Sequence, residues 1–224
     1  MEQKRILLAS PRGFCAGVAR AVAAVEETLR ICGAPVYVKH EIVHNRHVVA
    51  DLERKGAITI EMLSEAPEGS VVVFSAHGSP RAHYEEARER KVTLIDATCP
   101  LVTKVHLELL RYLKEGYRVL YIGHRGHIEG IGVLGEAPDE EIPIIETVSD
   151  VDRLDLGNPE KLVYLTQTTL SIDETADIIA ALKGKYPQIS APPLQDICFA
   201  TTNRQIAVKA LARQVELVLI FGSQ

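Results

Sequence analysis

Residues 71–96 read VVVFSAHGSPRAHYEEARERKVTLID, a stretch that predicts a strand, a helix and a second strand in direct succession. The apolar, β-branched runs at 71–74 and 92–95 are typical of buried strands. Residues 81–90 between them are expected to form the helix. Strands that alternate with helices of about ten residues indicate βαβ units, in which the strands lie parallel and the crossover is right-handed.

The same alternation extends to both ends of the chain. Further strands are predicted at 5–9, 36–38, 118–122, 142–145, 162–165 and 216–221. Further helices are predicted at 16–31, 46–55, 100–115, 172–183 and about 202–214. Ser171 with Glu174, and Thr202 with Gln205, are candidate capping boxes at the starts of the last two helices. We therefore expect an α/β protein with parallel sheets, and ligands bound beyond the carboxyl ends of the strands.

Composition and charge exclude several classes of protein. The chain has 224 residues, of which 46% are hydrophobic and 25% charged, and these values suit a packed globular protein. The net charge of −5 and the lack of a long basic run argue against nucleic acid and anionic membrane as partners. No apolar stretch approaches the roughly 20 residues that a transmembrane helix needs. The apolar run at the N-terminus breaks at residues 10–12, too early for a signal peptide, so we expect a cytoplasmic protein, or one in an organelle stroma.

Three of the four cysteines share a local context. Cys15, Cys99 and Cys198 each follow a short apolar run and precede a predicted helix, and Asp96 and Asp196 stand shortly before the last two. This pattern indicates a degenerate threefold structural repeat with one thiol in each unit. The units on this hypothesis are 15–98, 99–197, and 1–14 together with 198–224. No helix follows the last predicted strand, so the third unit is expected to be incomplete.

Thiols at helix N-termini suit metal binding, because the helix dipole and the free N–H groups stabilise the thiolate form. The chain has no C-x-x-C pair of the kind typical of a mononuclear zinc site. Single thiols from three units fit a larger inorganic centre better, such as a [4Fe–4S] cluster in which three thiolates leave one iron open. The alternative is that all three are small buried residues. The fourth cysteine, Cys32, falls in the last turn of a predicted helix and is expected to lie in the core.

Histidines gather after the predicted strands. His44 follows the strand at 36–38, His77 follows the strand at 71–74, and His124 and His127 follow the strand at 118–122. Imidazoles at strand ends donate hydrogen bonds and can carry charge near neutral pH, so together with helix N-termini they suit an anion such as a diphosphate. Each histidine alone could equally be structural or solvated.

Two further side chains are candidates for handling a proton. Glu129 lies two residues after His127, and a carboxyl with a raised pKa could donate a proton. Thr168 lies just past the strand at 162–165, and its hydroxyl could relay or hold a proton. The alternatives are an exposed loop glutamate and an ordinary turn threonine.

Residues 40–44 read HEIVH and match the H-E-x-x-H pattern of zinc hydrolases. That pattern binds zinc only on a helix, where the two histidines share a face. Ile42 and Val43 are β-branched, and the strand predicted at 36–38 runs directly into His40. A zinc hydrolase built on His40 and His44 is therefore the least favoured interpretation.

Taken in order, these residues resemble the LytB/IspH family of iron–sulfur reductases. The similar motifs are 11–18 (PRGFCAGV), 44–45 (HN), 75–78 (SAHG), 96–100 (DATCP), 123–127 (GHRGH), 166–169 (TQTT) and 197–201 (ICFAT). Each motif is weak alone, but the ordered set is very specific and covers essentially the whole chain.

The resemblance implies three α/β units, related by a pseudo-threefold axis, around a central [4Fe–4S] cluster. The cluster ligands that it implies are Cys15, Cys99 and Cys198. The ligands of a substrate diphosphate that it implies are His44, His77 and His127. It further implies that Glu129 delivers protons and that Thr168 contacts the substrate hydroxyl.

The reaction that the resemblance implies is the reductive removal of the hydroxyl from 4-hydroxy-3-methylbut-2-enyl diphosphate. The products would be isopentenyl and dimethylallyl diphosphates, formed in the last step of the methylerythritol phosphate route to isoprenoids. Single electrons would arrive from ferredoxin or flavodoxin.

The chain departs from the family in two places. A Ser/Asn-rich loop expected directly after Gly222 and Ser223, and a later serine of the same pocket, are absent, so we expect a chain that is cut short at its C-terminus. Residues 128–133 read IEGIGV, where the family usually has Pro-Glu-Val and a later Gly-Thr. Because the loop would complete the diphosphate site, a non-catalytic phospho-ligand-binding or iron-sensing fragment stays an alternative.

Overall fold

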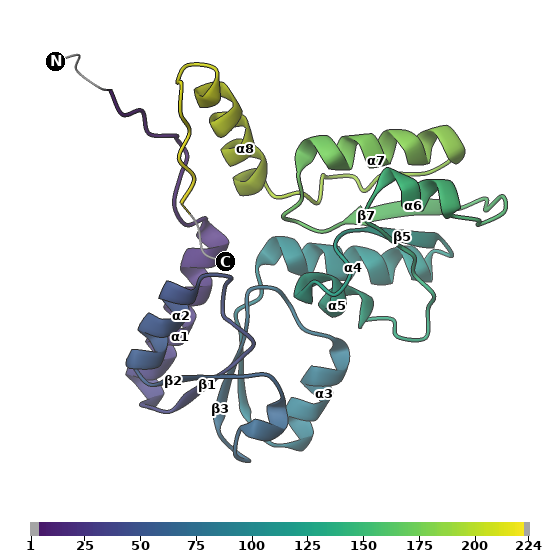
Figure 1. The fold of residues 1–224 in the computed structure, drawn as a ribbon. Coiled ribbons are helices and arrows are strands. Elements are labelled where there is room, and N and C mark those ends of the chain that lie inside the picture. Colours follow the sequence, from purple (N-terminus) through teal and green to yellow (C-terminus); the bar gives the residue numbers. More distant parts are fainter. Residues whose placement is uncertain (1–4, 222–224) are drawn as a thin grey trace.

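The computed structural model describes residues 5–221, which form two parallel β-sheets with helices on both faces of each (Figure 1). The first sheet has the order β2-β1-β3-β4 and the second has the order β6-β5-β7, and all of the strand pairs are parallel. The strands of the first sheet are β1 (Val36–Lys39), β2 (Ala57–Ile60), β3 (Val71–Phe74) and β4 (Thr93–Asp96). The strands of the second are β5 (Arg118–Ile122), β6 (Ile144–Ile145) and β7 (Leu162–Thr166). The predicted α/β class is confirmed.

The first sheet is buried on both faces because alternate residues of its strands point in opposite directions. On one face Val38 and Val73 pack with α1 (Ala16–Cys32) and α2 (Arg46–Arg54). On the other face Val72 and Phe74 pack with Ala87 and with the short 3₁₀ turn η1. Ala87 belongs to α3 (Arg81–Glu89), and η1 covers Leu63–Glu65. Of the run that predicted β3, Val72, Val73 and Phe74 are fully buried and Val71 is partly exposed.

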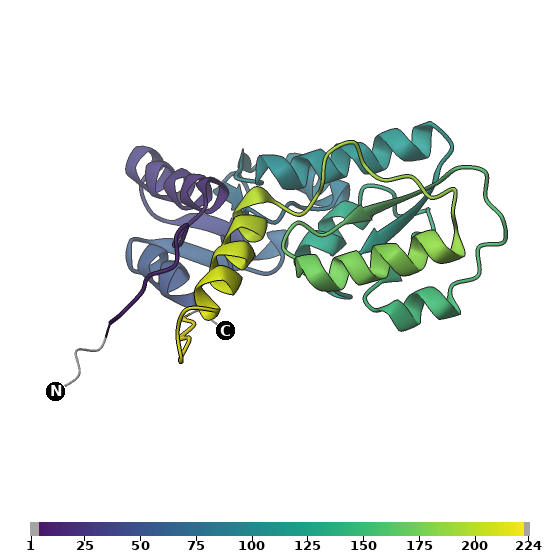
Figure 2. The ribbon, with the colours of Figure 1, turned by 90° about the horizontal axis from the view of Figure 1, so that it is seen from above.

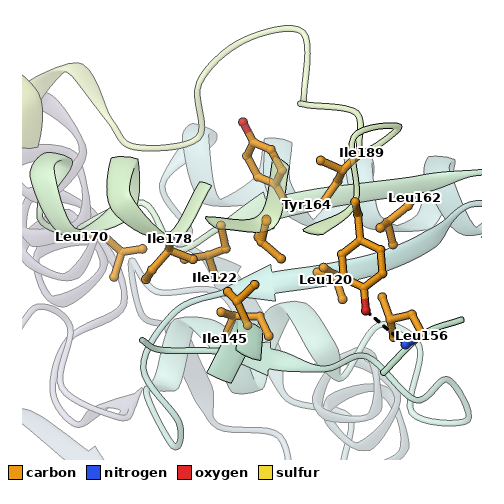
Figure 3. Packing of buried hydrophobic residues seen from close by; sticks show 12 residues of the cluster. Leu120, Ile122, Ile145, Leu156, Leu162, Tyr164, Leu170, Ile178 and Ile189 are labelled. Carbon is orange, nitrogen blue, oxygen red and sulfur yellow. Dashed lines mark hydrogen bonds between the residues drawn. The ribbon is translucent and has the colours of Figure 1, made fainter. Parts of the chain in front are cut away.

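The second sheet repeats this arrangement. Val119 and Tyr121 of β5 pack under α4 (Pro100–Lys114) and α5 (Ile128–Leu134). The opposite face packs against α6 (Val148–Arg153) and α7 (Ile172–Lys185), and Figure 3 shows this cluster. Its labelled members are Leu120, Ile122, Ile145, Leu156, Leu162, Tyr164, Leu170, Ile178 and Ile189. The two sheets therefore have separate cores.

The same type of backbone hydrogen bond occurs at Cys99 and at Cys198. The amide of Cys99 donates to the carbonyl of Ala76 at 3.0 Å, two residues past the end of β3. The amide of Cys198 donates to the carbonyl of Thr168 at 2.9 Å, two residues past the end of β7. The same local geometry thus brings each cysteine beside the end of a central strand. The boundaries 15–98 and 99–197, and the third unit formed by 1–14 with 198–224, stay predictions.

Helix α8 (Phe199–Ala212) stands apart from both sheets and runs beside the N-terminal segment (Figures 1 and 2). The Arg204 guanidinium donates to the carbonyl of Gly13 at 2.8 Å, which links the two segments. None of the residues of α8 is buried. The capping box predicted from Thr202 and Gln205 is wrong, because α8 begins at Phe199 with Cys198 as its N-cap. Gln205 instead binds the backbone of Leu170 and Ile172.

The strands predicted at 5–9 and 216–221 are also wrong. A strand is stabilised by its ladder of hydrogen bonds, and within residues 5–221 neither segment pairs with another. Their apolar side chains are solvated, with Ile6 87% and Phe221 89% exposed. Residues 222–224, where a loop was predicted, lie outside the described part of the chain.

Several short elements escaped prediction. Helix α5 contains Gly130 and Gly132, which are poor helix formers, and β2 and α6 are only four and six residues long. Over residues 5–221, no helix combines the length and the apolar character that crossing a membrane requires.

Candidate functional site

The carboxyl ends of the two sheets meet at three histidines. His44 and His77 follow strands of the first sheet and His127 follows β5 of the second. The ring centroids of His44 and His77 are 4.1 Å apart, those of His44 and His127 are 5.4 Å apart, and those of His77 and His127 are 6.4 Å apart. The predicted gathering of these residues is confirmed. His124 differs from them, because its ring lies 3.4 Å from the Glu146 carboxylate.

Two histidines of this cluster, His77 and His127, have lowered pKa values, so their neutral forms are favoured. Burial, followed by the neighbouring His44 and His127, lowers the pKa of His77 to about 3. Burial, followed by His44 and His124, also lowers the pKa of His127. Imidazoles so close together repel each other when protonated, and an anion bound among them would offset that repulsion. The arrangement is therefore suited to a multiply charged anion.

The tautomer of His127 is fixed by its neighbour. The amide of Glu129 donates to Nδ1 of His127 at 3.1 Å, so Nδ1 carries no proton. In the neutral ring the proton must then lie on Nε2, which becomes a hydrogen-bond donor. His127 is also the N-cap of α5, so the start of this helix orients the ring.

Glu129 and Thr168 form a buried pair next to the histidines. The Thr168 amide donates to Oε1 of Glu129 at 2.7 Å, and the Thr168 hydroxyl donates to Oε2 at 2.8 Å. Glu129 is 2% exposed and Thr168 is 4% exposed. Burial raises the pKa of Glu129 to about 7, although both hydrogen bonds from Thr168 act in the opposite direction. The readings of an exposed loop glutamate and an ordinary turn threonine are therefore wrong.

The three predicted metal ligands occupy equivalent positions. Cys15, Cys99 and Cys198 are the N-cap residues of α1, α4 and α8, and none of them forms a disulfide. All three are partly exposed, so the alternative that they are buried core residues is wrong. Thiolate sulfur is the cysteine ligand that iron and zinc bind.

Two of these thiols lie beside Gly17 in the first turn of α1. A Cβ on Gly17 would stand 2.9 Å from Sγ of Cys99 and 3.7 Å from Sγ of Cys15. Only glycine leaves room for both sulfurs at this position. The first two thiols thus meet, as predicted.

The third thiol lies at the start of α8, a helix that contacts the segment before Cys15. Its helix contacts Gly13 through Arg204, and Gly13 lies two residues before Cys15. The Cys198 sulfur accepts a hydrogen bond from the Thr201 amide at 3.3 Å. Over residues 5–221, no three His, Cys, Asp or Glu side chains form a ready metal-binding group. The donor set therefore has the chemistry of a metal centre, with Cys15 and Cys99 together and Cys198 on a neighbouring element.

Two other expectations can be compared with the structure. Cys32 was expected in the core but is exposed, and it is the last residue of α1, beyond the buried Ala21, Val25 and Thr28. Residues 40–44 form bends and no helix, as expected for a chance match to H-E-x-x-H. His40 instead binds Nζ of Lys39 at 2.6 Å and Glu61 at 2.7 Å.

The sequence did not reveal a buried ion pair near Cys198. Oδ1 of Asp196 accepts a hydrogen bond from Nζ of Lys104 at 2.7 Å, and Oδ2 accepts one from the Thr166 amide at 2.8 Å. Asp196 had been noted only as a mark of the repeat. No sequence signal points to Lys104, because an isolated lysine on an amphipathic helix is usually solvated.

Comparisons with known proteins agree with this geometry. The family model described as LytB protein matches residues 6–224. The 4-hydroxy-3-methylbut-2-enyl diphosphate reductase of Streptomyces coelicolor is 55% identical over 221 residues, covering 99% of this chain and 65% of that protein. The reductase of the same name from Neisseria meningitidis serogroup C is 52% identical over 223 residues, covering 100% and 69%.

Solved structures give the same result. The E-1-hydroxy-2-methyl-but-2-enyl-4-diphosphate reductase of Plasmodium falciparum has a TM-score of 0.93 and 46% identity, covering 96% of this chain and 67% of that one. A second structure, of an (E)-4-hydroxy-3-methyl-but-2-enyl diphosphate reductase, has a TM-score of 0.77 and 32% identity. The chain thus spans about two thirds of the length of the relatives that it matches.

Proposed function

Because this chain belongs to the LytB family, we propose that it carries the reductase chemistry of its relatives, the removal of a hydroxyl from 4-hydroxy-3-methylbut-2-enyl diphosphate. The observation that carries the proposal is the meeting of His44, His77 and His127 beside the buried Glu129–Thr168 pair. Replacing C–OH by C–H consumes two electrons and two protons and releases one water. The protein must therefore bind an anionic substrate, supply protons and receive electrons.

The three histidines would bind the diphosphate. His127 offers Nε2–H because its Nδ1 is occupied by the Glu129 amide. His44 and His77 lie within ring contact of it and of each other, so the three can share one phosphate group. Since burial lowers the pKa values of His77 and His127 in the protein alone, binding of the anion would draw protons onto these two rings.

Glu129 would supply a proton at the hydroxyl that leaves as water. Its pKa of about 7 lets it hold a proton near neutral pH, where an exposed glutamate would be ionised. The Thr168 amide stays a donor to Oε1 throughout. When Oε2 is protonated, the Thr168 hydroxyl becomes its acceptor and can turn its own hydrogen toward the substrate. Thr168 would thus pass the proton from Glu129 to the leaving oxygen.

Cys15, Cys99 and Cys198 would hold a [4Fe–4S] cluster, which when bound would supply electrons one at a time. The chemistry of three N-cap thiols and the space left at Gly17 support this assignment. The electron donor would be a ferredoxin or a flavodoxin, and the cytoplasm the compartment.

The proposal is tested by turnover of the hydroxylated diphosphate, with a chemical reductant replacing the natural electron donor. We expect Glu129→Gln to abolish turnover while iron stays bound, because glutamine preserves the shape of the side chain but cannot donate that proton. Full turnover by this variant would remove Glu129 from the proton path. Tight diphosphate binding with no turnover by the unaltered chain would favour the non-catalytic alternative.

A further inference from the structure

Asp196 is a buried carboxylate that joins three elements. Its side chain is fully buried, and its two oxygens accept hydrogen bonds from Lys104 of α4 and from the amide of Thr166 at the end of β7. Lys104 also donates to Glu108 at 2.9 Å and to the carbonyl of Leu194 at 3.0 Å, so all three of its ammonium hydrogens are used. The ion pair therefore holds residues 194–196 against α4 and β7.

Each residue of the ion pair lies close in the chain to one of the proposed metal ligands. Asp196 lies two residues before Cys198, and Lys104 lies in the helix that Cys99 begins. The pair is thus a direct polar link between the elements that carry these two thiols. The Cys198 carbonyl accepts a hydrogen bond from the Thr202 amide of its own helix, and the Cys198 amide donates to the carbonyl of Thr168 beside β7.

Apolar packing holds this segment only in part, since Ile197 is partly buried against the core of the second sheet. A cavity of about 280 Å³ lies between residues 191–197 and α7, and Asp196 lines it. Helix α8, which follows Cys198, buries none of its residues. Beside that packing, the buried polar contacts of Asp196 tie the chain to α4 and β7 directly before Cys198.

Asp96, the equivalent aspartate of the first unit, forms a different set of hydrogen bonds. Oδ1 of Asp96 accepts hydrogen bonds from the amide and hydroxyl of Thr98, and Oδ2 accepts one from Tyr84. These contacts stay within one unit and stabilise the local turn before Cys99. Only Asp196 reaches another cysteine's helix, so its role cannot be the turn alone.

We propose that the buried Lys104–Asp196 ion pair is a positioning device that sets Cys198 against Cys99. The proposal rests on the proposed function only in assuming that the two thiols share one metal centre. Both residues act through Cys198 and neither is a metal ligand. Loss of Lys104 leaves the buried Asp196 without its cation, and loss of the Asp196 carboxylate removes the ion pair that ties this segment to α4, so in both cases the segment should open locally.

The first test measures hydrogen exchange at two backbone amides of the full chain, those of Cys198 and Cys99. We expect Asp196→Asn and Lys104→Met each to speed exchange at Cys198 by about tenfold or more, and to change exchange at Cys99 by less than about twofold. Lys185→Met is the matched control, because Lys185 also donates to two carbonyls, those of Val151 and Asp152, but lies far from both thiols. Equal acceleration at both cysteines, or none at Cys198, would overturn the proposal. Lys104 is 20% exposed, so Lys104→Met keeps the test decisive if Asp196→Asn does not fold.

The second test measures iron bound per chain after anaerobic reconstitution with iron and sulfide. We expect Asp196→Asn and Lys104→Met to bind several-fold less iron than Lys185→Met. Normal iron content in variants whose Cys198 amide exchanges faster would overturn the role of the pair in placing a ligand. If the unaltered chain binds no iron, the proposed function fails, while the exchange measurement still decides whether the pair positions Cys198.

Discussion

The carboxyl of Glu129 lies where a negative charge is costly, and the protein offsets only part of that cost. Burial raises the pKa, and two hydrogen bonds from Thr168 lower it again without restoring the usual value. The result is a group that exchanges a proton near neutral pH. Burial favours the neutral form of His77 too, and for an imidazole this lowers the pKa.

The pKa of Glu129 predicts a pH-dependent stability. Its value is about 7 in the folded protein and 4.5 in the unfolded chain, so the folded protein binds this proton more tightly. The resulting stabilisation is complete below pH 4.5 and is lost as the pH rises through 7. Relative to Glu129→Gln, the unaltered protein should lose about 3 kcal/mol of unfolding free energy over that interval. Urea unfolding of both proteins at a series of pH values measures this difference.

His77 acts in the other direction but does not disturb the comparison. Its lowered pKa stabilises the fold above pH 6.5, and this stability is lost as the pH falls toward 3. Because both proteins contain His77, its effect cancels in their difference. A difference between the two proteins that stays constant with pH would contradict the assignment of Glu129.

Gly17→Ala tests the space between the first two thiols. The added Cβ would stand 2.9 Å from Sγ of Cys99, so one of the sulfurs must shift, and iron content should fall several-fold. Gly184→Ala is the matched control, because Gly184 also lies in a helix but has no atom within 4 Å of an added Cβ. The control should keep its iron and gain about 0.5–1 kcal/mol of stability. Equal iron content in the two variants would show that Gly17 does not provide space for the sulfurs.

At the scale of elements, α4 and α8 share a cysteine N-cap but differ in how they are held. Helix α4 buries five residues, among them Val105 and Leu109, against the second sheet. Helix α8 buries none and is held by polar contacts of Arg204, Gln205 and Lys209. A helix with few buried contacts has a low free energy of local opening.

Gln205→Ala should release α8 without unfolding the sheets. The side chain of Gln205 ties α8 to the start of α7. Its Oε1 accepts a hydrogen bond from the Ile172 backbone amide, and its Nε2 donates one to the Leu170 carbonyl. Hydrogen exchange in residues 199–212 should become several-fold faster, while α4 stays protected. Gln188→Ala, which removes contacts with Asn158 and Pro159 only, should leave α8 unchanged. Unaltered exchange in α8 of the Gln205 variant would mean that other contacts hold the helix.

In the molecule as a whole, each of the two sheets has helices on both faces, and the carboxyl ends of the strands of one sheet face those of the other. Ligands in such sheets bind beyond the carboxyl ends of the strands, and here two sets of ends contribute to one site. His44 and His77 come from the first sheet, while His127, Glu129 and Thr168 come from the second. The site therefore exists only when both sheets are folded and in contact.

Binding of inorganic diphosphate tests this shared site. We expect His77→Ala and His127→Ala, one from each sheet, to weaken binding by roughly 10- to 100-fold each, as loss of a charged hydrogen bond does. His47→Ala is the control, because His47 is an exposed residue of α2 outside the cluster. Calorimetric titration measures the three affinities. Wild-type affinity in both cluster variants would place the anion elsewhere.

The sequence predicted the parts of this molecule that depend on local pattern. The β-branched runs predicted β3 and β5 with their observed bounds. The segments that follow the strands identified the histidines, Glu129 and Thr168 as candidate site residues. The sequence did not predict features that depend on contacts between residues far apart in the chain. Residues 5–9 have the composition of a strand but no ladder to join, and Lys104 gains its importance only from Asp196, which lies 92 residues away.

Metal analysis of the anaerobically purified chain is the sharpest test of a cluster held by Cys15, Cys99 and Cys198. We expect a brown protein with about four irons and matching sulfide per chain, and loss of both the colour and the iron in Cys99→Ser. A colourless or zinc-loaded protein, or iron retained without the thiol of Cys99, would contradict it.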